Sequence, residues 1–507
     1  MGVAARLSLG LLFALSGGGC GGQAKAPTGA RAPRRDSPAR RLAAHTLPAT
    51  GNEQLAFDVR LNAPLAQLDV QVCATGFRIE RLEAPSAGAQ ALLSGGKIVT
   101  PEGDYPCPDE GVDFPHSKRD ECLRYTVVLP EKTPDPTSLR RVGRDLLASP
   151  DLWLWVPTPR PANLPMRVHF RLPAGVVAAL PWPHWPGSQD DFALSETAFA
   201  WKSAGAFGHA AVESLSVAGG QLDWAPLGEG FREHAGEVRD WLLQSARASS
   251  LLFGHLPVPH TLVLAVPGER ARASFGMALR GGGPAVVLLL DRRVNAQTLA
   301  SDWTATHEFL HLGVPRLPPE DAWLFEGLAT YYTELVRARA GLITPAQAYQ
   351  HLLDGFERGR KNTSARTLRQ ESAEMRENHA FYRVYWSGAA LAFLTDIGAR
   401  EAGGPTLDSA LRSFASCCAT SEEDWDAERV VARLDAWLGA PRLATLAQAW
   451  LDRADFPNVE SALRDLGVAS GARGEAVLSQ APQAALRDAL MAPTSQTEAN
   501  GQPHQGE

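Results

Sequence analysis

The chain has 507 residues, 45% of them hydrophobic, and a formal net charge of −7 at pH 7. This length leaves room for two or three domains, each with a core of its own. Because the charge is small and is spread without long runs of one sign, the composition argues against a nucleic-acid partner.

The first twenty residues have the features of an export signal. Leu7–Leu15 form an apolar stretch that is too short to span a bilayer, and a Ser/Gly run then precedes Cys20. This arrangement resembles the cleavage site of bacterial lipoproteins, although Gly17 stands where leucine is usual. We therefore expect residues 1–20 to be a lipoprotein-type signal peptide. A lipidated Cys20 would then attach the protein to a membrane of the cell envelope, in the outer membrane or periplasm, with secretion as the alternative.

Residues 21–46 are rich in Gly, Ala, Pro and Arg, which predicts a disordered tether. Residues 47–215 are predicted to form an N-terminal β-sandwich-like domain, because runs of β-forming residues recur and end in turn residues. The predicted strands are Phe57–Leu61, Leu68–Val72, Tyr125–Pro130, Leu152–Val156 and Met166–Pro173.

The cysteines are consistent with export to an oxidising compartment. Cys73, Cys107 and Cys122 lie in the β-rich region, and Cys417 and Cys418 are adjacent in a later helical region. A disulfide between Cys107 and Cys122, or between Cys73 and one of these two, fits the sequence, and the spacing does not decide the connectivity. The spacings do not suit a cysteine metal cluster.

From about residue 216 to residue 400 the pattern becomes mixed α/β. A long helical run at Phe231–Leu252 is followed by buried-type strands at Thr261–Pro267 and Ala285–Asp291. The next helix is expected to start near Asn295 or Ser301 as N-cap residue.

That helix contains the sequence Thr-His-Glu-Phe-Leu-His at residues 306–311. His307 and His311 are four residues apart and therefore share one helix face, which suits two ligands of a tetrahedral Zn²⁺. Glu308 projects beside them, where it can act as general base toward a metal-activated water. A further helical run, opened by two prolines and two acids at 318–321, offers Glu326 as the third protein ligand.

Chance alone gives H-E-x-x-H in roughly a few of every hundred chains of this length, so the context matters. Leu299, Trp303, His307 and Leu310 recur at helical spacing, which places the histidines on a buried stripe. Since buried polar groups need partners, this context favours a metal site over an unliganded histidine pair.

The motif together with the run Trp323–Tyr332 resembles the gluzincin metallopeptidases, and most of all the glycyl aminopeptidase family. The resemblance implies a thermolysin-like catalytic domain, His307, His311 and Glu326 as zinc ligands, and Glu308 as catalytic base.

A later segment, Tyr385-Trp386-Ser387-Gly388-Ala389, resembles the Tyr-x-x-Gly-Ala segment of the same family. The resemblance implies that the Tyr385 hydroxyl stabilises the oxyanion formed during hydrolysis. Tyr382, one turn earlier, competes for this role. Thr330, one turn after Glu326, is a candidate to support a ligand histidine, with a bond to its own helix backbone as the alternative.

One family feature is missing. Related aminopeptidases carry a glutamate for the substrate's α-amine on a strand upstream of the zinc helix. The corresponding stretch, residues 273–283, contains no acid, and Arg280 has the wrong sign to bind an ammonium group. The sequence therefore leaves aminopeptidase and endopeptidase activity open.

Beyond residue 400 we expect a helical C-terminal subdomain at 401–475 and a disordered tail at 476–507, without the peptide-binding module that many relatives carry. The predicted fold is thus multidomain α+β. The predicted function is zinc-dependent hydrolysis of peptides or proteins in the cell envelope, with one Zn²⁺ per chain. The rival hypothesis is a non-catalytic surface lipoprotein that uses the same fold for binding.

Overall fold

The computed structural model describes residues 46–47, 51–106, 112–114, 117–131, 135–209, 211–268 and 275–492. All of these belong to one compact unit, Pro38–Glu507. The expected signal peptide with Cys20, nearly all of the expected tether, and Cys107 lie outside the described residues. None of the described helices combines the length and the apolar character needed to cross a membrane.

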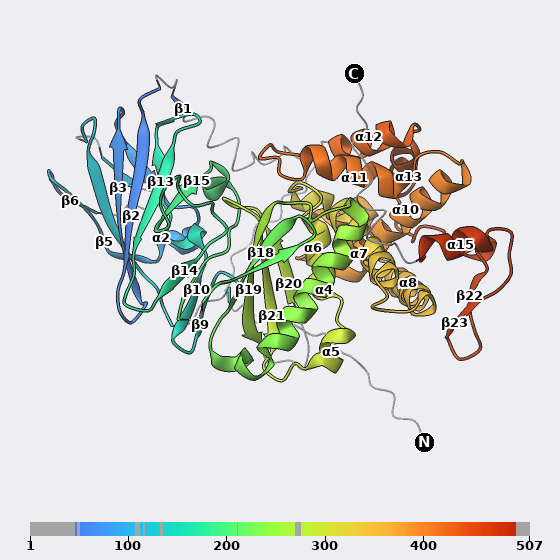
Figure 1. Ribbon diagram of the computed structural model, residues 1–507. Helices are drawn as coiled ribbons and strands as arrows, with labels where there is room; N and C mark the ends of the chain where they lie inside the picture. The colour runs from blue at the N-terminus through green and yellow to red at the C-terminus, as the bar shows by residue number, and fades with distance from the viewer. Residues whose placement is uncertain are drawn as a thin grey trace. The chain divides into compact units, whose positions relative to one another are not determined.

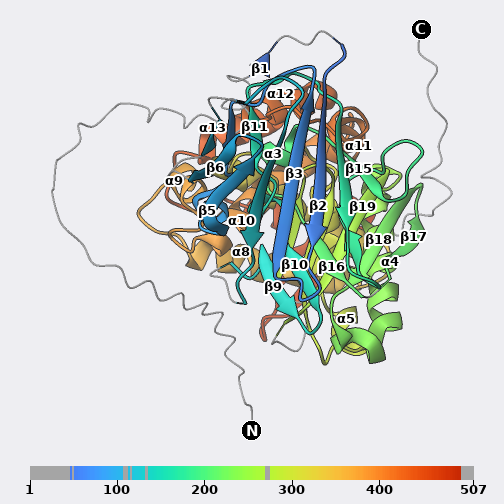
Figure 2. The same cartoon turned by 90° about the vertical axis from the view of Figure 1, so that its left-hand side faces the viewer.

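The N-terminal part of the described chain consists of β-sheets, as predicted. In β2 the buried residues Leu55, Phe57, Val59 and Leu61 alternate with more exposed ones, the pattern of a strand with one face on a core. Seven strands pair in the order β15-β13-β2-β3-β8-β5-β6, and Figure 2 shows β2 and β3 side by side. Their bounds are β2 Gln54–Leu61, β3 Gln67–Thr75, β5 Leu93–Thr100, β6 Gly103–Pro106, β8 Cys122–Val128, β13 Met166–Arg171 and β15 Asp191–Leu194.

Smaller sheets complete this part. A four-stranded sheet has the order β14-β16-β10-β9, a three-stranded sheet has the order β11-β4-β7, and β1 pairs with β12. The bounds are β1 Thr46–Leu47, β4 Arg81–Glu83, β7 Val112–Asp113, β9 Leu139–Val142, β10 Asp145–Ala148, β11 Val156–Thr158, β12 Arg160–Pro161, β14 Val177–Ala179 and β16 Ala206–Gly208, with short helices α2 Ala87–Gln90 and α3 Thr197–Ala200.

The predicted strand at 152–156 is wrong for most of its length. A 3-10 helix, Pro150–Leu152, occupies its start, and β11 begins only at Val156. Between them, the Tyr125 hydroxyl donates a hydrogen bond to the Trp153 carbonyl (2.9 Å) and accepts one from the Trp155 backbone N–H (3.0 Å). A buried side chain thus satisfies backbone groups that the prediction assigned to a strand.

The cysteines form two disulfides among the described residues. Cys73 and Cys122 face each other across β3 and β8 and are bonded, which agrees with one of the pairings left open by the sequence. Cys417 is bonded to its neighbour Cys418.

The second part begins with a mixed five-stranded sheet in the order β17-β18-β19-β21-β20. The strands β18, β19 and β21 are parallel, whereas β17 and β20 run antiparallel to their neighbours at the two edges. One face packs against α4 and α6, and the other shares a core with β10 and β16. Figure 1 shows α4 alongside the strands of this sheet. The bounds are β17 Glu213–Val217, β18 Gly220–Pro226, β19 His260–Gly268, β20 Phe275–Leu279, β21 Ala285–Asp291, α4 Ala235–Phe253, α5 Ala296–Ala300 and α6 Thr304–His311.

The predicted histidine helix is divided in two. Asn295 caps α5 as predicted, through a reciprocal bond with Thr298, but the helix stops at Ala300. The chain restarts as α6 at Thr304, whose backbone N–H donates to the Asp302 carboxylate at 2.8 Å.

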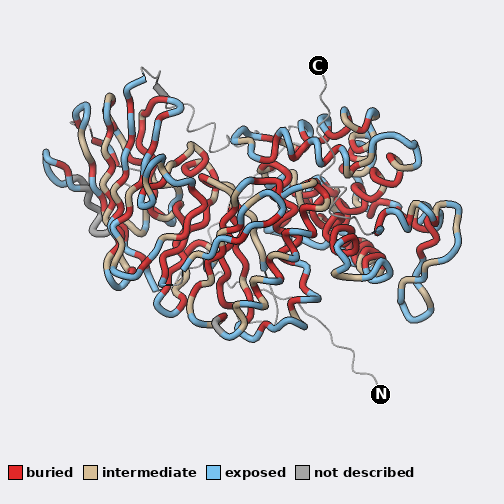
Figure 3. The backbone as a smooth tube through the Cα atoms, viewed as in Figure 1, coloured by how far each residue is buried: buried red, intermediate tan, exposed pale blue. Residues whose placement is uncertain are grey.

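The third part is helical, and much of its chain is buried (Figure 3). Its buried apolar residues, from α7 to α15, form one large core to which α4 and α6 also contribute. Its elements are α7 Ala322–Arg339, α8 Pro345–Lys361, α9 Leu368–Ala373, α10 Phe381–Glu401, α11 Leu407–Cys418, α12 Ala427–Leu438, α13 Arg442–Trp450, α14 Glu460–Asp465, β22 Val468–Ser470, β23 Ala476–Leu478 and α15 Ala484–Leu490.

The prediction of a disordered tail from residue 476 is wrong for residues 476–492. β23 pairs with β22, and α15 buries Leu490 in the helical core. Arg339 donates to the carbonyl of Leu490, and Tyr349 donates to the carbonyl of Arg487, each at 2.9 Å. The segment also uses its backbone carbonyls to satisfy polar side chains buried on α7 and α8. The remainder, 493–507, lies outside the described residues.

Candidate active site

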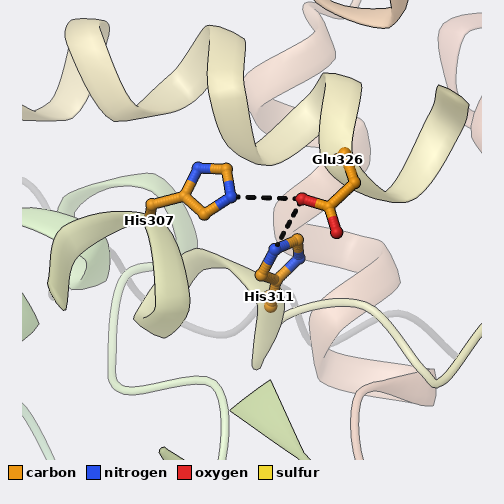
Figure 4. A group of neighbouring side chains, drawn as sticks. All are labelled: His307, His311 and Glu326. Carbon is orange, nitrogen blue, oxygen red and sulfur yellow. Dashed lines mark hydrogen bonds and ion pairs between the residues drawn. The ribbon is translucent and has the colours of Figure 1, made fainter. Parts of the chain in front are cut away.

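Three side chains from two helices converge on one point (Figure 4). The Nε2 atoms of His307 and His311 on α6 lie 3.2 Å and 3.3 Å from the same oxygen, Oε2 of Glu326 on α7. Both imidazoles are nearly fully buried, whereas the Glu326 side chain keeps 16% of its surface exposed. The structure therefore brings together the three residues that the sequence predicted as metal ligands.

The hydrogen bonds around His307 show that this cluster suits a cation. Thr333 Oγ1 donates its only proton to the Ala329 carbonyl at 2.6 Å, and it lies 3.3 Å from Nδ1 of His307. Nδ1 then donates to Thr333, so that Nε2 is the ring nitrogen that faces the Glu326 carboxylate and is placed to bind a metal. Two imidazole nitrogens and a carboxylate are also the donor set that Zn²⁺ favours.

The electrostatics of Glu326 agree with this reading. Burial alone would raise the pKa of Glu326, but the neighbouring His311 and His307 outweigh it and lower the pKa well below its usual range. The carboxylate is therefore ionised and available as a ligand.

His311 is held at the end of α6 through the backbone. The Arg280 guanidinium, which follows β20, donates to the carbonyls of His311 (3.0 Å) and Val314 (2.8 Å). Burial lowers the pKa of Arg280 to about 10, so the group stays charged. The His311 ring stacks on Phe325 with a centroid distance of 4.1 Å, and its Nδ1 has no hydrogen-bond partner among the described residues. The sequence analysis considered Arg280 only as a possible substrate contact. The structure shows that it instead fixes the C-terminal end of α6.

Glu308 is a residue of α6, and its side chain lies against the edge strand β20. It is 6% exposed, and the backbone N–H of Ala278 donates to its carboxylate. Burial raises the pKa of Glu308 to about 7, with the charge of His307 opposing and that of Glu326 assisting the rise. A Cβ atom on Gly276 would lie 2.5 Å from Cγ of Glu308, so only glycine leaves room for the carboxylate at this place.

Tyr385 of α10 lies beside the ligands. Its ring stacks on His307 with a centroid distance of 6.0 Å and an interplanar angle of 11°. Burial, the carboxylates of Glu326 and Glu308, and a hydrogen bond to Glu326 raise the pKa of Tyr385 well above its usual value, which keeps the hydroxyl protonated as a donor. Tyr382 is 43% exposed, so the structure favours Tyr385 for the role for which both competed.

The sequence offered Thr330 either as a support for a ligand histidine or as a donor to its own helix backbone, and the structure shows neither contact within the residues it describes. Thr330 Oγ1 is buried without a hydrogen-bond partner in the described part of the chain, and Thr333 takes the position next to His307. Thr333 lies seven residues after Glu326, two helical turns along the same face. This helical spacing from Glu326 is the feature of the sequence that could have identified Thr333.

One protein family has a sequence profile that matches part of this chain. The sequence profile of the M61 glycyl aminopeptidase family matches residues 316–390, which contain Glu326, Tyr385 and Gly388. The stretch with His307 and His311 lies just before the matched residues. No curated protein sequence matches the chain.

The fold is shared with a solved structure, and a second solved structure is similar at a lower score. An aminopeptidase N family protein from Idiomarina loihiensis has a TM-score of 0.65 at 14% sequence identity, over 82% of this chain and 78% of that chain. The M1 zinc metallopeptidase from Deinococcus radiodurans has a TM-score of 0.48 at 16% identity, over 80% of this chain and 94% of that one. A mutant of the latter has been crystallised with a Tyr-Ser-Ala substrate.

The ligand cluster and the family match together define the class of this protein: it is a zinc metallopeptidase of the gluzincin type. Its architecture, with N-terminal β-sheets followed by a mixed sheet and helices, is that of the Idiomarina protein.

Proposed function

We propose that the protein hydrolyses peptide bonds with a single Zn²⁺ held by His307, His311 and Glu326. The observation that carries this proposal is the convergence of two imidazole nitrogens and an ionised carboxylate on one point, with a protonatable carboxylate alongside. Zn²⁺ at this point supplies Lewis acidity, which polarises a carbonyl and acidifies a water molecule.

The neighbouring side chains perform the proton and charge transfers. Glu308 accepts the proton of the attacking water and later delivers it to the departing amine. Tyr385, kept protonated in its surroundings, donates a hydrogen bond to the oxygen on which negative charge develops. Thr333 holds the ring of His307 in the tautomer that leaves Nε2 free for the metal.

The proposed substrates include peptides without a free α-amine. On β20, Gly276 faces Glu308, and Ala278 lies two residues further on the same face. Residues 275–280 contain no carboxylate that would hold an ammonium group, which supports endopeptidase activity. Because β20 is the edge strand of its sheet, its outer backbone groups suit a substrate in extended conformation.

The test combines metal analysis with hydrolysis. We expect one zinc per chain, loss of peptide hydrolysis on chelation, and recovery on addition of Zn²⁺. Glu308→Gln should keep the zinc and lose hydrolysis by a factor of about a thousand or more. Retention of full function by Glu308→Gln would instead support the binding-module hypothesis.

A pair of peptides resolves the mode of cleavage. A peptide with a free amine and its N-acetylated form should be cleaved at similar rates at the same internal bond. Cleavage that requires the free amine would reject endopeptidase activity in favour of aminopeptidase activity.

A location in the cell envelope, through lipidation of Cys20, is part of the same proposal. The signal-like sequence supports it, and the Cys73–Cys122 disulfide supports an oxidising compartment. The full-length chain should fractionate with membranes and incorporate labelled fatty acid, and Cys20→Ser should abolish both. A wild-type chain found only in the cytosol would reject this location.

A further inference from the structure

Exposed aromatic side chains gather around the proposed site. The exposed aromatic residues in the described part of the chain are Phe275 (40%), Trp303 (46%), Phe381 (39%) and Tyr382 (43%). Trp303 immediately precedes α6, and Phe381 and Tyr382 open α10, the helix of Tyr385. Phe275 begins β20, but its neighbour Gly276 faces Glu308, so strand alternation turns Phe275 to the opposite side.

Two of these rings contact the site directly. The Trp303 ring meets the His307 ring edge to face, with centroids 5.3 Å apart. At the other end, the Phe381 ring meets the Tyr385 ring at 6.5 Å and 81°, and Tyr385 stacks on His307. A continuous series of rings therefore runs from Trp303 through His307 and Tyr385 to Phe381. Its two ends are exposed, and its middle carries the metal ligand and the oxyanion donor.

We propose that Trp303 and Phe381 form apolar walls of the substrate site and select peptides with a large apolar side chain next to the cleaved bond. This inference rests on the proposed function, because it places the scissile carbonyl beside His307 and Tyr385. A peptide bound there brings its flanking side chains against the exposed rings. A Phe or Leu side chain removes apolar surface from water at this contact, whereas Gly has no side chain to bury.

The kinetic test uses N-acetylated, C-amidated peptides that differ only in the residue before or after the cleaved bond. With wild-type protein, kcat/KM for Phe or Leu should exceed that for Gly or Ser by roughly tenfold or more. Trp303→Ala and Phe381→Ala should each lower this ratio several-fold, and Trp303→Phe should restore most of it. Val477→Ala, an exposed apolar residue on β23, is the matched control and should leave the ratio unchanged. A wild-type preference for Gly, or an unchanged ratio in both alanine variants, overturns the inference.

A binding measurement makes the outcome independent of catalysis. In the Glu308→Gln background, calorimetry should show the Phe peptide binding roughly tenfold more tightly than the Gly peptide, and Trp303→Ala should remove the difference. Because Trp303 touches His307, zinc content is measured for every variant and should stay at one per chain. If wild-type protein cleaves no peptide but the Phe peptide still binds more tightly than the Gly peptide, the proposed function is wrong and the inference of apolar walls is supported. Equal affinities for the two peptides reject the walls even when cleavage is observed.

Discussion

Gly327 of α7 and Gly388 of α10 meet where the two helices cross, and neither position has room for a side chain. A Cβ atom on Gly388 would overlap the carbonyl oxygen of Trp323 and would lie 2.8 Å from Cα of Gly327. The contact brings Glu326, the residue before Gly327, close to Tyr385, which lies one turn before Gly388. The Glu-Gly and Tyr-x-x-Gly segments are therefore two halves of one helix crossing.

We expect Gly388→Ala to destabilise the protein by about 3 kcal/mol, because the added methyl group must push α10 away from α7. The same shift of α10 moves Tyr385 away from Glu326. The folded fraction of the variant should therefore hydrolyse peptides more slowly than wild type. Thermal and urea unfolding measure the first effect. Gly236→Ala on α4 is the control, since a Cβ atom there has no neighbour within 4 Å and the change should be neutral or slightly stabilising. Equal stabilities of Gly388→Ala and wild type would contradict the tight crossing.

Thr333→Val should lower the affinity for zinc by about tenfold to a hundredfold, because His307 loses the acceptor that fixes its tautomer. Competition with a chromophoric chelator measures this affinity. Thr330→Val is a matched control on the same helix. Its hydroxyl has no partner among the described residues, so this variant should bind zinc normally and be at least as stable as wild type. The reverse result would assign the supporting role to Thr330.

Gly276→Ala should separate metal binding from catalysis. The new Cβ atom would lie 2.5 Å from Cγ of Glu308, so the carboxylate must move, while the three ligands lie on other elements. We expect one zinc per chain and a fall in kcat/KM of about a hundredfold or more, because the displaced carboxylate is less able to accept the proton of the attacking water. Metal analysis and steady-state kinetics on the same preparation check both halves. Loss of zinc with the activity would show that β20 supports the ligands as well.

A pH-dependent contribution to stability is expected from Asp223 on β18, far from the ligand cluster in sequence. Burial alone would raise the pKa of Asp223, but hydrogen bonds from His260, Ser214 and Gln221 outweigh it and lower the pKa to about 2. The unfolded value is near 3.9. Since the folded pKa is the lower one, the stabilisation is fully present above about pH 4 and is lost as the pH falls toward 2.

Asp223→Asn should therefore destabilise the protein at pH 7 and pH 5, and its deficit should shrink between about pH 4 and pH 3. Urea unfolding at each pH gives the difference in free energy. Asp240→Asn on α4, where the side chain is 62% exposed, should show no comparable trend. A deficit that stays constant down to pH 3 would exclude the charged form of Asp223 as its source.

Local sequence predicted the elements whose pattern agrees with their final environment. The alternation in β2 and the apolar run of β21 were predicted because each strand buries its apolar residues in the expected way. The prediction failed at Trp153 and Trp155, which form no regular ladder because the distant Tyr125 satisfies their backbone groups. It failed again at α15, where burial of Leu490 in the helical core and long-range bonds from Arg339 and Tyr349 hold a segment predicted to be a disordered tail.

The sequence by itself determined the candidate ligand set, because helical spacing fixes which face His307 and His311 share and because Glu326 lies in a segment that resembles a family motif. Only the tertiary structure decided which groups surround these ligands: Thr333 rather than Thr330 beside His307, Arg280 on the end of α6, and the glycine crossing that brings up Tyr385. The physical reason is distance along the chain. Helical periodicity relates residues within a few turns, whereas these contacts depend on how separate helices and strands pack, and that packing is set by side chains far away in sequence.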